Sequence, residues 1–425
     1  MADKEICLLN DSFPPIIDGV ANAVTNYARV LHDNGQKVCV VTPEVSGADD
    51  SGYPYPVLRY QSLDLRDQIG YTVGNPLSLA ISQTLKNRPI GLLHSHCPMM
   101  SQYLARTIRV QQNVPIVMTY HTKFDIDIAN AVKSRVLQKS AITALVENVS
   151  ASDELWVVSR GAGENIRSLG YQGDYIVMEN GVDMQKGRAS EELIEKNCGQ
   201  YDLPSTVPVF LFVGRLMWYK GLRIILDAMK ALSSQQVDYR MVFIGSGGDE
   251  EEIKAYTKEL MIDNKVFFVG AVRDRDDLRA WYSRADMFLF PSTFDTNGLV
   301  VREASACELG SVLIRGSAAA EGIKDNVNGV LIDENAASLT ACLMKLIYQK
   351  DAMRTIGENA CDEIYLSWDS AVKRAMERYE IVMDNYKCGK YPKHVTPADS
   401  LFKFRQDAVE LLDKFKNMVL PEGDY

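Results

Sequence analysis

The stretch VPVFLFVGRLMWYKGL, residues 207–222, decides the fold. A continuous apolar run ends at Gly214, Arg215 follows it, and Lys220 precedes a glycine and a helical segment. Continuous apolar runs that alternate with helices are typical of parallel sheets covered on both faces. A cationic pair at the end of such a strand, beside a helix N-terminus, is suited to binding a diphosphate. The residues alone leave surface charge near a turn equally open.

Both halves of the chain show this alternation. The strand candidates are ICLLN, KVCVVT, GLLHSH, PIVMTYH, ELWVVS and DYIVMEN in the first half, and VPVFLFVG, YRMVFIG, KVFFVG, MFLFPS, SVLIRG and GVLID in the second. The polar stretch 183–206 lies between them and is interpreted as an inter-domain linker. The pattern predicts an α/β chain with two doubly wound Rossmann-like domains, 1–190 and 191–366, facing a central cleft. The C-terminal helical segment, 367–425, is expected to cross back onto the first domain.

Composition and charge narrow the class of protein. The 425 residues carry a formal net charge of −10 with a pI near 5.2, which argues against a dedicated nucleic-acid binder. Eight cysteines occur without a CxxC pair, as expected of buried thiols in a reducing compartment. The N-terminus lacks the build of a signal peptide, and no apolar run approaches the ~20 residues that cross a bilayer. We therefore expect a cytoplasmic protein, free or on a membrane surface.

A second motif, FPSTFDTNGLVVREASA, spans residues 290–306. Its loop carries Asp295 and Gly298, and Glu303 lies in the helix that follows. Carboxylates accept hydrogen bonds from sugar hydroxyls, and a glycine lets backbone amides approach a phosphate. An acid that only stabilises the N-terminus of a helix is the alternative.

Together the two motifs resemble the signature of retaining glycosyltransferases of family 4, which have the GT-B fold. The resemblance covers the chain to about residue 386. It implies that Arg215 and Lys220 bind the donor diphosphate and stabilise it as it leaves, and that Glu303 binds the ribose hydroxyls. Asp295 takes the place of the first acid of a Glu-x7-Glu segment that contacts the donor sugar. Since the family usually has Glu there, the identity of the donor sugar stays open.

The same resemblance implies further donor contacts, and it requires no metal or other cofactor. The backbone after Asp295 is expected to approach the sugar and phosphates, and backbone beyond the strand KVFFVG is expected to hold the base. The residues concerned are Asn297, Gly298, Leu299, Val300 and Val272. Two Asp-x-Asp triplets, Asp125/Asp127 and Asp274/Asp276, lack the pattern that surrounds a metal site.

In the stretch NDSFPPIIDGVANAV, residues 10–24, two prolines and a glycine interrupt the chain before a helix that is expected from Ala21. The family has a glycine-containing loop here that contacts the donor phosphates and the acceptor. This implies that Gly19 admits the phosphates to the helix N-terminus and that Asp18 lies near the acceptor. Phe13 is a candidate apolar wall for the acceptor. A simple Pro/Gly turn is the alternative.

His121 ends the strand candidate PIVMTYH, where the family places a histidine near the transferred sugar. We expect it to hydrogen-bond the sugar and to steady the reacting geometry, and a purely structural histidine is the alternative. Arg160, after the next strand candidate, is a weaker candidate for a phosphate or acceptor contact.

A helix expected over residues 128–146 carries Arg135 and Lys139 on its apolar face. The apolar members of that face are Ile128, Val132, Val136, Ile142 and Val146. A membrane interface accommodates both kinds of residue, because long basic side chains bury their stems while their charges reach anionic headgroups. A solvated edge of a packed helix is the alternative.

The segments SFPPIIDGVANAV, TYHTKFDIDI and FDTNGLVVREA also resemble bacterial diacylglycerol glucosyltransferases, which are monotopic. This resemblance implies transfer of a hexose, with UDP-glucose as the expected donor, to diacylglycerol at the inner face of the cell membrane. The expected partners are a nucleotide sugar, the lipid acceptor and an anionic membrane surface, and no nucleic acid. Open alternatives are a soluble or polyprenyl-linked acceptor, a small polyol, a nucleotide-sugar isomerase, and a non-catalytic nucleotide-sugar binder. A tail helix, about 396–419, is expected to pack on the body or to contact a partner or membrane.

Overall fold

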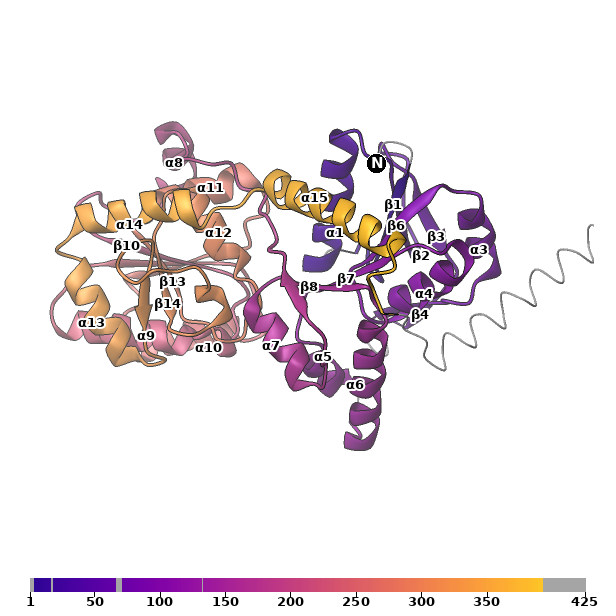
Figure 1. Ribbon diagram of the computed structural model, residues 1–425. Coiled ribbons are helices and arrows are strands. Elements are labelled where there is room, and N and C mark those ends of the chain that lie inside the picture. The colour runs from indigo at the N-terminus through magenta and orange to yellow at the C-terminus, as the bar shows by residue number, and fades with distance from the viewer. Residues whose placement is uncertain (1–3, 17, 66–70, 132, 393–425) are drawn as a thin grey trace, which may run out of the picture. The chain divides into compact units, whose positions relative to one another are not determined.

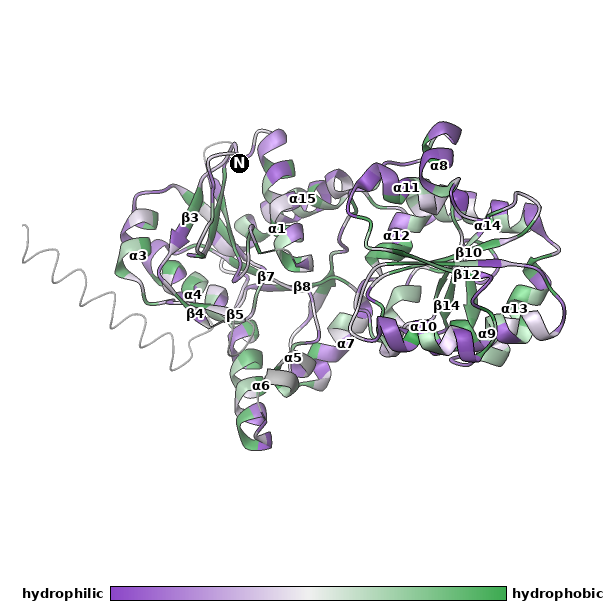
Figure 2. Cartoon of the chain, turned by 180° about the vertical axis from the view of Figure 1, so that it is seen from behind, coloured by the Kyte–Doolittle hydropathy of each residue, from purple (hydrophilic) through white to green (hydrophobic). Residues whose placement is uncertain are grey.

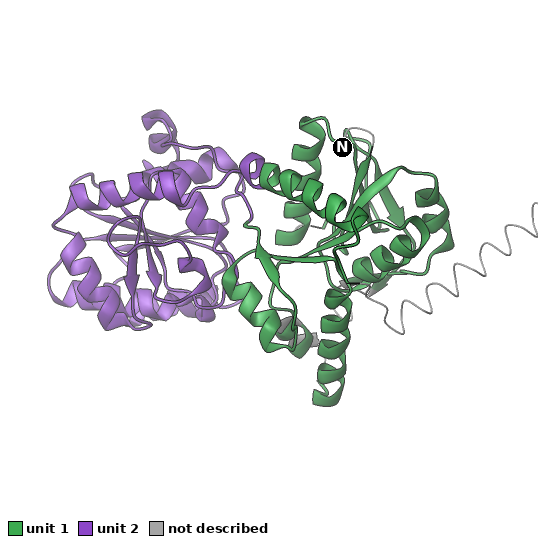
Figure 3. Ribbon diagram, in the orientation of Figure 1, with its two compact units in different colours: residues 1–179, 372–425 green, residues 180–371 purple. Residues whose placement is uncertain are grey.

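The computed structural model describes residues 4–16, 18–65, 71–131 and 133–392, which form two compact units (Figure 1, Figure 3). Unit 1 lies within residues 1–179 and 372–425, and unit 2 comprises residues 180–371. Each unit contains a parallel sheet with helices packed on it (Figure 1). The α/β class and the two parallel Rossmann-like sheets predicted from the alternation are therefore confirmed.

Unit 1 has, within its described residues, a seven-stranded parallel sheet in the order β3-β2-β1-β6-β7-β8-β9. The strands are β1 Glu5–Leu9, β2 Val38–Pro43, β3 Val57–Tyr60, β6 Ile90–Ser95, β7 Ile116–Tyr120, β8 Glu154–Val157 and β9 Tyr175–Val177. An antiparallel pair, β4 Ser62–Leu65 and β5 Tyr71–Gly74, lies outside this sheet. The helices are α1 Gly19–Asp33, α3 Leu79–Lys86, α4 Met100–Gln112, α5 Phe124–Ala131, α6 Arg135–Ser150 and α7 Arg160–Ser168.

Unit 2 has a six-stranded parallel sheet in the order β12-β11-β10-β13-β14-β15. The strands are β10 Val209–Val213, β11 Arg240–Ile244, β12 Val266–Gly270, β13 Met287–Phe290, β14 Ser311–Ile314 and β15 Val330–Ile332. The helices are α8 Glu191–Cys198, η1 Trp218–Lys220, α9 Leu222–Ser234, α10 Glu250–Glu259, α11 Arg275–Arg284, α12 Leu299–Ala306, η2 Ala318–Ala320, α13 Ala336–Leu346 and α14 Lys350–Glu363. A last helix, α15 Trp368–Lys387, begins in unit 2 and continues in unit 1.

Apolar strands explain why both sheets form. Every residue of β1, β2, β10 and β13 is buried, and these strands are rich in Val, Leu, Ile and Phe. Residues of this kind favour strands and suit a sheet that is covered on both faces. Figure 2 shows hydrophobic residues concentrated along the strands of each unit.

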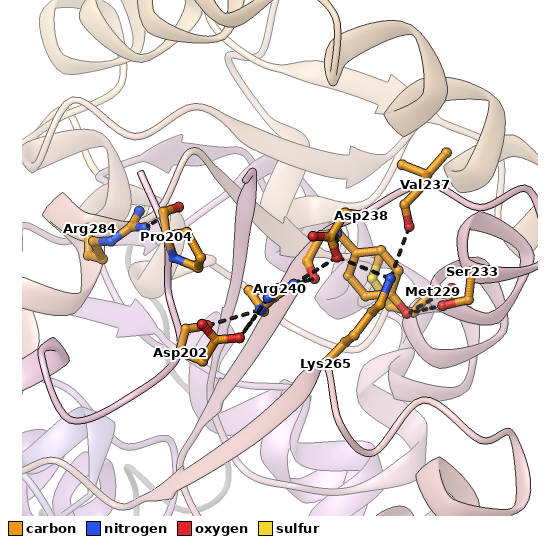
Figure 4. A network of polar contacts seen from close by, with 10 residues as sticks. Asp202, Pro204, Met229, Ser233, Val237, Asp238, Arg240, Lys265 and Arg284 are labelled. Atoms are coloured by element: carbon orange, nitrogen blue, oxygen red, sulfur yellow. Dashed lines mark hydrogen bonds and ion pairs between the residues drawn. The ribbon is translucent and has the colours of Figure 1, made fainter. Parts of the chain in front are cut away.

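A network of ion pairs lies at the amino ends of the strands in unit 2 (Figure 4). Arg240, the first residue of β11, pairs with Asp202 at 2.6 Å and with Asp238 at 2.8 Å. Asp238 in turn lies 3.1 Å from Lys265, which precedes β12. Because ligands of parallel α/β sheets bind at the opposite, carboxyl ends, this network is structural.

The later turns of α15 pack within unit 1. Arg378 forms an ion pair with Glu154 of β8 at 2.6 Å, and Tyr379 stacks on Trp156 of the same strand. Tyr379 is fully buried. The end of the chain that the structure describes is thus anchored to the first sheet.

The stretch 183–206, interpreted as a linker from its polarity, is part of unit 2 instead. Four of its apolar side chains are buried in the core of that unit, namely Met184, Ala189, Ile194 and Cys198. Ser190 caps α8 by accepting a hydrogen bond from the amide of Leu193. A short helix with one buried side is polar on average, which is why its composition suggested a linker.

The helix expected over residues 128–146 is also wrong as a single element. It is two helices, since α5 ends at Ala131 and α6 begins at Arg135. Ser134 has extended backbone (φ −85°, ψ 119°), as is typical of the residue before a helix. The helix face predicted from Ile128 onward therefore does not continue into α6. The short strands β3, β4 and β5 were not predicted, and the predicted tail helix lies outside the described residues.

None of the helices in the described part of the chain has the length and hydropathy needed to cross a bilayer.

Candidate active site

The strand order places two motif loops side by side at the carboxyl ends of the unit 2 sheet. Strands β10 and β13 are neighbours, with Phe210 paired to Met287, and the strand order reverses direction between them. Such a switch point is where open parallel sheets bind ligands. The loop after β10 carries Lys220, and the loop after β13 carries Asp295. Their Nζ and Oδ1 atoms lie 2.6 Å apart.

This ion pair is partly enclosed. The side chain of Lys220 is 10% exposed and that of Asp295 is 23% exposed. The other carboxylate oxygen of Asp295 accepts a hydrogen bond of 2.6 Å from the hydroxyl of Ser292. The motif lysine and the motif acid, 75 residues apart in the sequence, thus share one site within unit 2.

Gly221 makes this approach possible. Its backbone has φ +78°, and a Cβ there would lie 2.0 Å from the carbonyl oxygen of Pro291. A side chain at this position would clash with the backbone at the end of β13 and strain its own conformation. Glycine therefore lets the start of α9 pack against β13, which brings Lys220 to Asp295.

Arg215 has different surroundings from Lys220. Its side chain is exposed and makes no hydrogen bond or ion pair among the residues that the structure describes, whereas its carbonyl accepts from the amide of Met217. It follows the carboxyl end of β10. An exposed guanidinium without a protein partner is available to an anion such as a phosphate.

Glu303 lies buried inside α12 and both of its oxygens are hydrogen-bonded. Arg275 donates to one at 2.9 Å, and the hydroxyl of Tyr282 donates to the other at 3.1 Å. Burial raises the pKa of Glu303, and the charge of Arg275 opposes that rise. A carboxylate held by two donors retains lone pairs for hydroxyl ligands.

The start of α12 is an uncapped helix N-terminus. Gly298 has φ +59°, and no side chain caps the helix that begins at Leu299 and Val300. The side-chain nitrogen of Asn297 is buried there without a hydrogen-bond partner among the described residues. Uncapped amides and an unpaired amide nitrogen are the donors that an anionic or hydroxylated ligand requires. Val272, also expected at the donor, follows β12 and packs half-buried against the unit 2 core.

Asp18 caps α1 in unit 1. Its Oδ1 accepts hydrogen bonds of 2.8 Å from the amides of Val20 and Ala21, and the helix begins at Gly19 rather than at Ala21. A carboxylate thus already accepts from two of the amides that begin this helix, and the contact of Gly19 with the donor phosphates stays a prediction. A Cβ on Gly19 would meet no atom within 4 Å, so packing within the described chain does not require glycine there.

Phe13 is fully buried, and its ring lies 5.3 Å from that of Tyr53. It therefore does not form an open wall for an acceptor, as was expected from the sequence. A large aromatic side chain in a proline-rich loop gains more by packing into the unit 1 core than by facing solvent.

His121 directly follows β7 and is 6% exposed. Its Nε2 lies 2.9 Å from Nδ1 of His96. Burial lowers the pKa of His121 to about 3, so its ring is neutral at pH 7. Arg160, the first residue of α7, is exposed.

The basic residues of α6 are exposed at its beginning. Arg135 and Lys139 lie on the surface, together with Val136, which is 75% exposed, and Leu137, which is 60% exposed. The buried residues of this helix are confined to its C-terminal half, at Leu145, Asn148 and Val149. Figure 1 shows the helix standing out from the rest of unit 1.

Four residues that hold the candidate side chains were not predicted as part of the site. They are His96, Arg275, Tyr282 and Ser292. The alternation His94, His96 at the end of a strand was a usable signal, because residues two apart share a face. Nothing in the spacing of Arg275 or Tyr282 connects them with Glu303.

One aspartate of each Asp-x-Asp triplet makes hydrogen bonds within the protein. Asp274 caps α11 by accepting from the amides of Asp276 and Asp277, and Asp125 accepts from Asn165. Among the described residues, no group of three or more His, Cys, Asp and Glu side chains is arranged to hold a metal ion.

Comparison with known proteins gives matches over most of the chain. Residues 17–186 match the family model described as Glycosyltransferase Family 4, and residues 194–362 match the one described as Glycosyl transferases group 1. A sulfoquinovosyl transferase from Arabidopsis thaliana is 26% identical over 82% of this chain and 67% of its own. A D-inositol 3-phosphate glycosyltransferase from Corynebacterium kroppenstedtii is 27% identical over 83% of this chain and 80% of its own. An alpha-monoglucosyldiacylglycerol synthase from Acholeplasma laidlawii is 20% identical over 84% and 91%.

Solved structures share the fold over nearly the whole chain. A sucrose-phosphate synthase from Thermosynechococcus elongatus superposes with a TM-score of 0.72 at 20% identity, over 90% of this chain and 99% of its own. HepE from Anabaena, solved in complex with UDP, gives a TM-score of 0.71 at 18% identity, over 89% and 100%. At these identities the structures establish the fold alone.

Proposed function

Because the chain belongs to glycosyltransferase family 4 and has the GT-B fold, we propose that it is a retaining hexosyltransferase that moves glucose from UDP-glucose onto diacylglycerol. Family and fold were predicted from the two motifs, and both predictions are confirmed. The observation that supports the reaction best is the group Arg215, Lys220, Asp295 and Glu303 at the carboxyl ends of the unit 2 sheet. The proposed place of action is the inner face of the cell membrane.

In this proposal the donor binds to unit 2. Arg215 and Lys220 bind the diphosphate, and the open amides of Leu299 and Val300 add positive potential. Glu303, held by Arg275 and Tyr282, accepts hydrogen bonds from the ribose hydroxyls. A solved neighbour in complex with UDP supports a nucleotide donor of this kind. Backbone near Val272 contacts the base.

The proposed transfer retains the configuration of the sugar. The bond between the anomeric carbon and the diphosphate breaks, and the cationic groups stabilise the negative charge that develops on the leaving phosphate. The acceptor hydroxyl attacks on the same face, and its proton passes to the leaving phosphate. Asp295 and the neutral ring of His121 hydrogen-bond the sugar. Positive charge from side chains and helix amides serves this step without a metal ion.

The acceptor assignment is supported by one relative and one surface. The relative is named alpha-monoglucosyldiacylglycerol synthase, and it matches 84% of this chain. The surface is the start of α6, where Arg135 and Lys139 lie beside the exposed Val136 and Leu137. Exposed apolar and basic residues on one projecting helix suit an anionic membrane interface.

The direct test uses the purified full chain with UDP-glucose and diacylglycerol in anionic vesicles, and mass spectrometry of the lipids. UDP-galactose and GDP-mannose are run beside it, with a control that lacks diacylglycerol. We expect a hexosyl lipid from UDP-glucose only when the lipid is present, and an α linkage by NMR of the product. A β linkage would contradict retention, and the absence of glycolipid with every donor would contradict the lipid acceptor.

The membrane surface has a test of its own. Each basic residue near an anionic surface contributes about 1 kcal/mol, so Arg135→Ala with Lys139→Ala should weaken binding to anionic vesicles roughly 30-fold. Sedimentation with vesicles measures this. Lys324→Ala with Arg354→Ala, two exposed basic positions of unit 2, removes the same charge as a control. Equal losses in the two double variants would mean that α6 has no special part in binding.

A soluble acceptor is the second candidate, favoured by the D-inositol 3-phosphate glycosyltransferase that matches 83% of this chain. A polyprenyl-linked acceptor belongs to the same alternative. In that case UDP is released with a soluble or polyprenyl acceptor and vesicles are not needed. A nucleotide-sugar isomerase would consume the donor with no acceptor at all, which the control without lipid detects.

A further inference from the structure

We propose that His96 is a positioning residue for His121, donating from Nδ1 to Nε2 of His121 and so fixing the proton of His121 on Nδ1. The catalytic consequence rests on the proposed function, in which His121 hydrogen-bonds the transferred sugar. The pairing itself rests on geometry within unit 1.

The sheet fixes where the two rings meet. His96 follows β6 and His121 follows β7, and these strands are parallel neighbours in which Ser95 pairs with Met118. The amide of His96 donates to the carbonyl of Leu9 at 2.8 Å, which holds its backbone against β1. The ring nitrogens lie 2.9 Å apart, a normal hydrogen-bond distance. Two neighbouring strand ends therefore present one histidine to the other.

Packing holds the ring of His96 in place. Its side chain is fully buried, its ring centroid lies 3.9 Å from that of His94, and the ring of Tyr27 meets it at 5.1 Å. His94 is fixed in turn, because its two nitrogens contact the hydroxyls of Tyr379 at 2.5 Å and Thr119 at 2.7 Å. A ring enclosed in this way has little freedom to turn away from His121.

The number of protons decides the direction of the hydrogen bond. Burial lowers the pKa of His96 well below its ordinary value and that of His121 to about 3, so each ring carries one proton at neutral pH. Nε2 of His96 has no hydrogen-bond partner among the described residues. If Nε2 of His121 donated to Nδ1 of His96, the single proton of His96 would lie on its Nε2, which is buried and has no acceptor among the described residues.

If His96 donates from Nδ1 instead, its Nε2 carries no proton and only a lone pair is left without a partner there. Buried N–H groups without an acceptor are the rarer and costlier defect in folded proteins. His96 therefore carries its proton on Nδ1 and donates it to Nε2 of His121. His121 then carries its own proton on Nδ1, and this nitrogen is a hydrogen-bond donor. In the proposed reaction His121 thus donates to a sugar oxygen.

NMR of the full chain with ¹⁵N-labelled histidine tests the pairing without any assay of activity. The chain has five histidines, so single substitutions assign the ring signals. We expect His121 to be protonated on Nδ1 at pH 7, and His96→Leu to change that tautomer. A proton on Nε2 of His121, or an unchanged His121 in His96→Leu, would overturn the proposal.

Steady-state kinetics distinguishes a positioning role of His96 from a role in packing alone. Asn branches at Cγ as His does, so its amide nitrogen takes the place of Nδ1 and still donates. We expect His96→Leu to lower kcat about 10²-fold with little change in KM, because a misplaced contact loses about that much. His96→Asn should recover most of this loss. Equal losses in both variants would contradict the donor role of Nδ1.

Two controls complete the design. His32 is exposed at the end of α1, and His32→Gln should leave both kcat and the His121 tautomer unchanged. Circular dichroism and thermal unfolding establish that each variant folds before its kinetics are compared. If no donor yields glycolipid, the proposed function fails, while the NMR result still decides the pairing of His96 with His121.

Discussion

Lys220 and Asp295 form an ion pair in which Nζ and Oδ1 lie 2.6 Å apart. The diphosphate of a donor would therefore bind beside a lysine that already has an anionic partner. We predict that Lys220→Ala lowers kcat/KM for the nucleotide sugar about 10²–10³-fold, the usual effect of removing one group that stabilises transition-state charge. Lys220→Arg should retain part of the activity because the charge remains. Steady-state release of UDP measures all of these variants.

Lys265 provides a matched control for this prediction. It also belongs to unit 2 and is also paired with an aspartate, Asp238, at 3.1 Å, but it lies at the amino ends of the strands. Lys265→Ala should therefore leave kcat/KM nearly unchanged. Similar losses for Lys220→Ala and Lys265→Ala would mean that Lys220 acts through stability alone.

Individual residues show where prediction from the sequence ends. The motif 207–222 placed Arg215 and Lys220 together at the end of one strand, and the structure does so. It also gives them opposite surroundings, with Arg215 exposed and Lys220 buried against Asp295. A partner 75 residues away depends on strand order, which local spacing does not encode.

Among the helices, α1 depends on a single side chain at its start. Asp18 accepts from two amides, and removal of such a cap lowers the free energy of unfolding by about 1 kcal/mol. We predict this loss for Asp18→Ala and almost none for Asp18→Asn, because asparagine caps equally well. Urea unfolding measures both variants.

The same pair of variants separates capping from chemistry. If the charge of Asp18 serves the acceptor, Asp18→Asn lowers kcat while the free energy of unfolding stays at the wild-type value. If Asp18 only caps the helix, Asp18→Asn has wild-type kcat. A large loss of stability in Asp18→Asn would contradict the capping role.

At the level of elements, strong apolar runs were predictable and weak ones were not. All twelve quoted runs correspond to strands, and most of these strands are buried, which requires a parallel strand to be continuously apolar. The strands β3 to β5 were missed because each is only four residues long, and the helix α8 was missed because it is polar on average and is held by the two residues that it buries. The break between α5 and α6 was missed because helical spacing alone does not reveal an interruption.

Across the whole molecule, histidine is absent from the segment that forms unit 2. The sequence contains five, and residues 180–371 contain none. In unit 1, His94, His96 and His121 are buried, and burial lowers the pKa of each below its ordinary value. Their protonation in acid therefore bears on the stability of unit 1 and not on that of unit 2.

The sign of the effect follows from proton binding. Between pH 6.5 and the lowered values in the folded state, the unfolded chain binds more protons, so the free energy of unfolding falls as the pH falls. The slope is up to about 1.4 kcal/mol per pH unit for each buried histidine. The raised pKa of Glu303 in unit 2 acts in the opposite direction, because its neutral form is favoured in the fold. We therefore predict that unit 1 loses stability first on mild acidification.

Hydrogen–deuterium exchange at pH 7.5 and 5.5, corrected for the intrinsic exchange rate, locates the loss. Protection should fall in β6 and β7, which precede His96 and His121, while β10 and β11 keep theirs. His32→Gln should show the same profile as wild type, because His32 is exposed and lies outside the buried histidine cluster. Equal loss in both sheets, or a first loss in unit 2, would mean that the buried histidines do not govern acid stability.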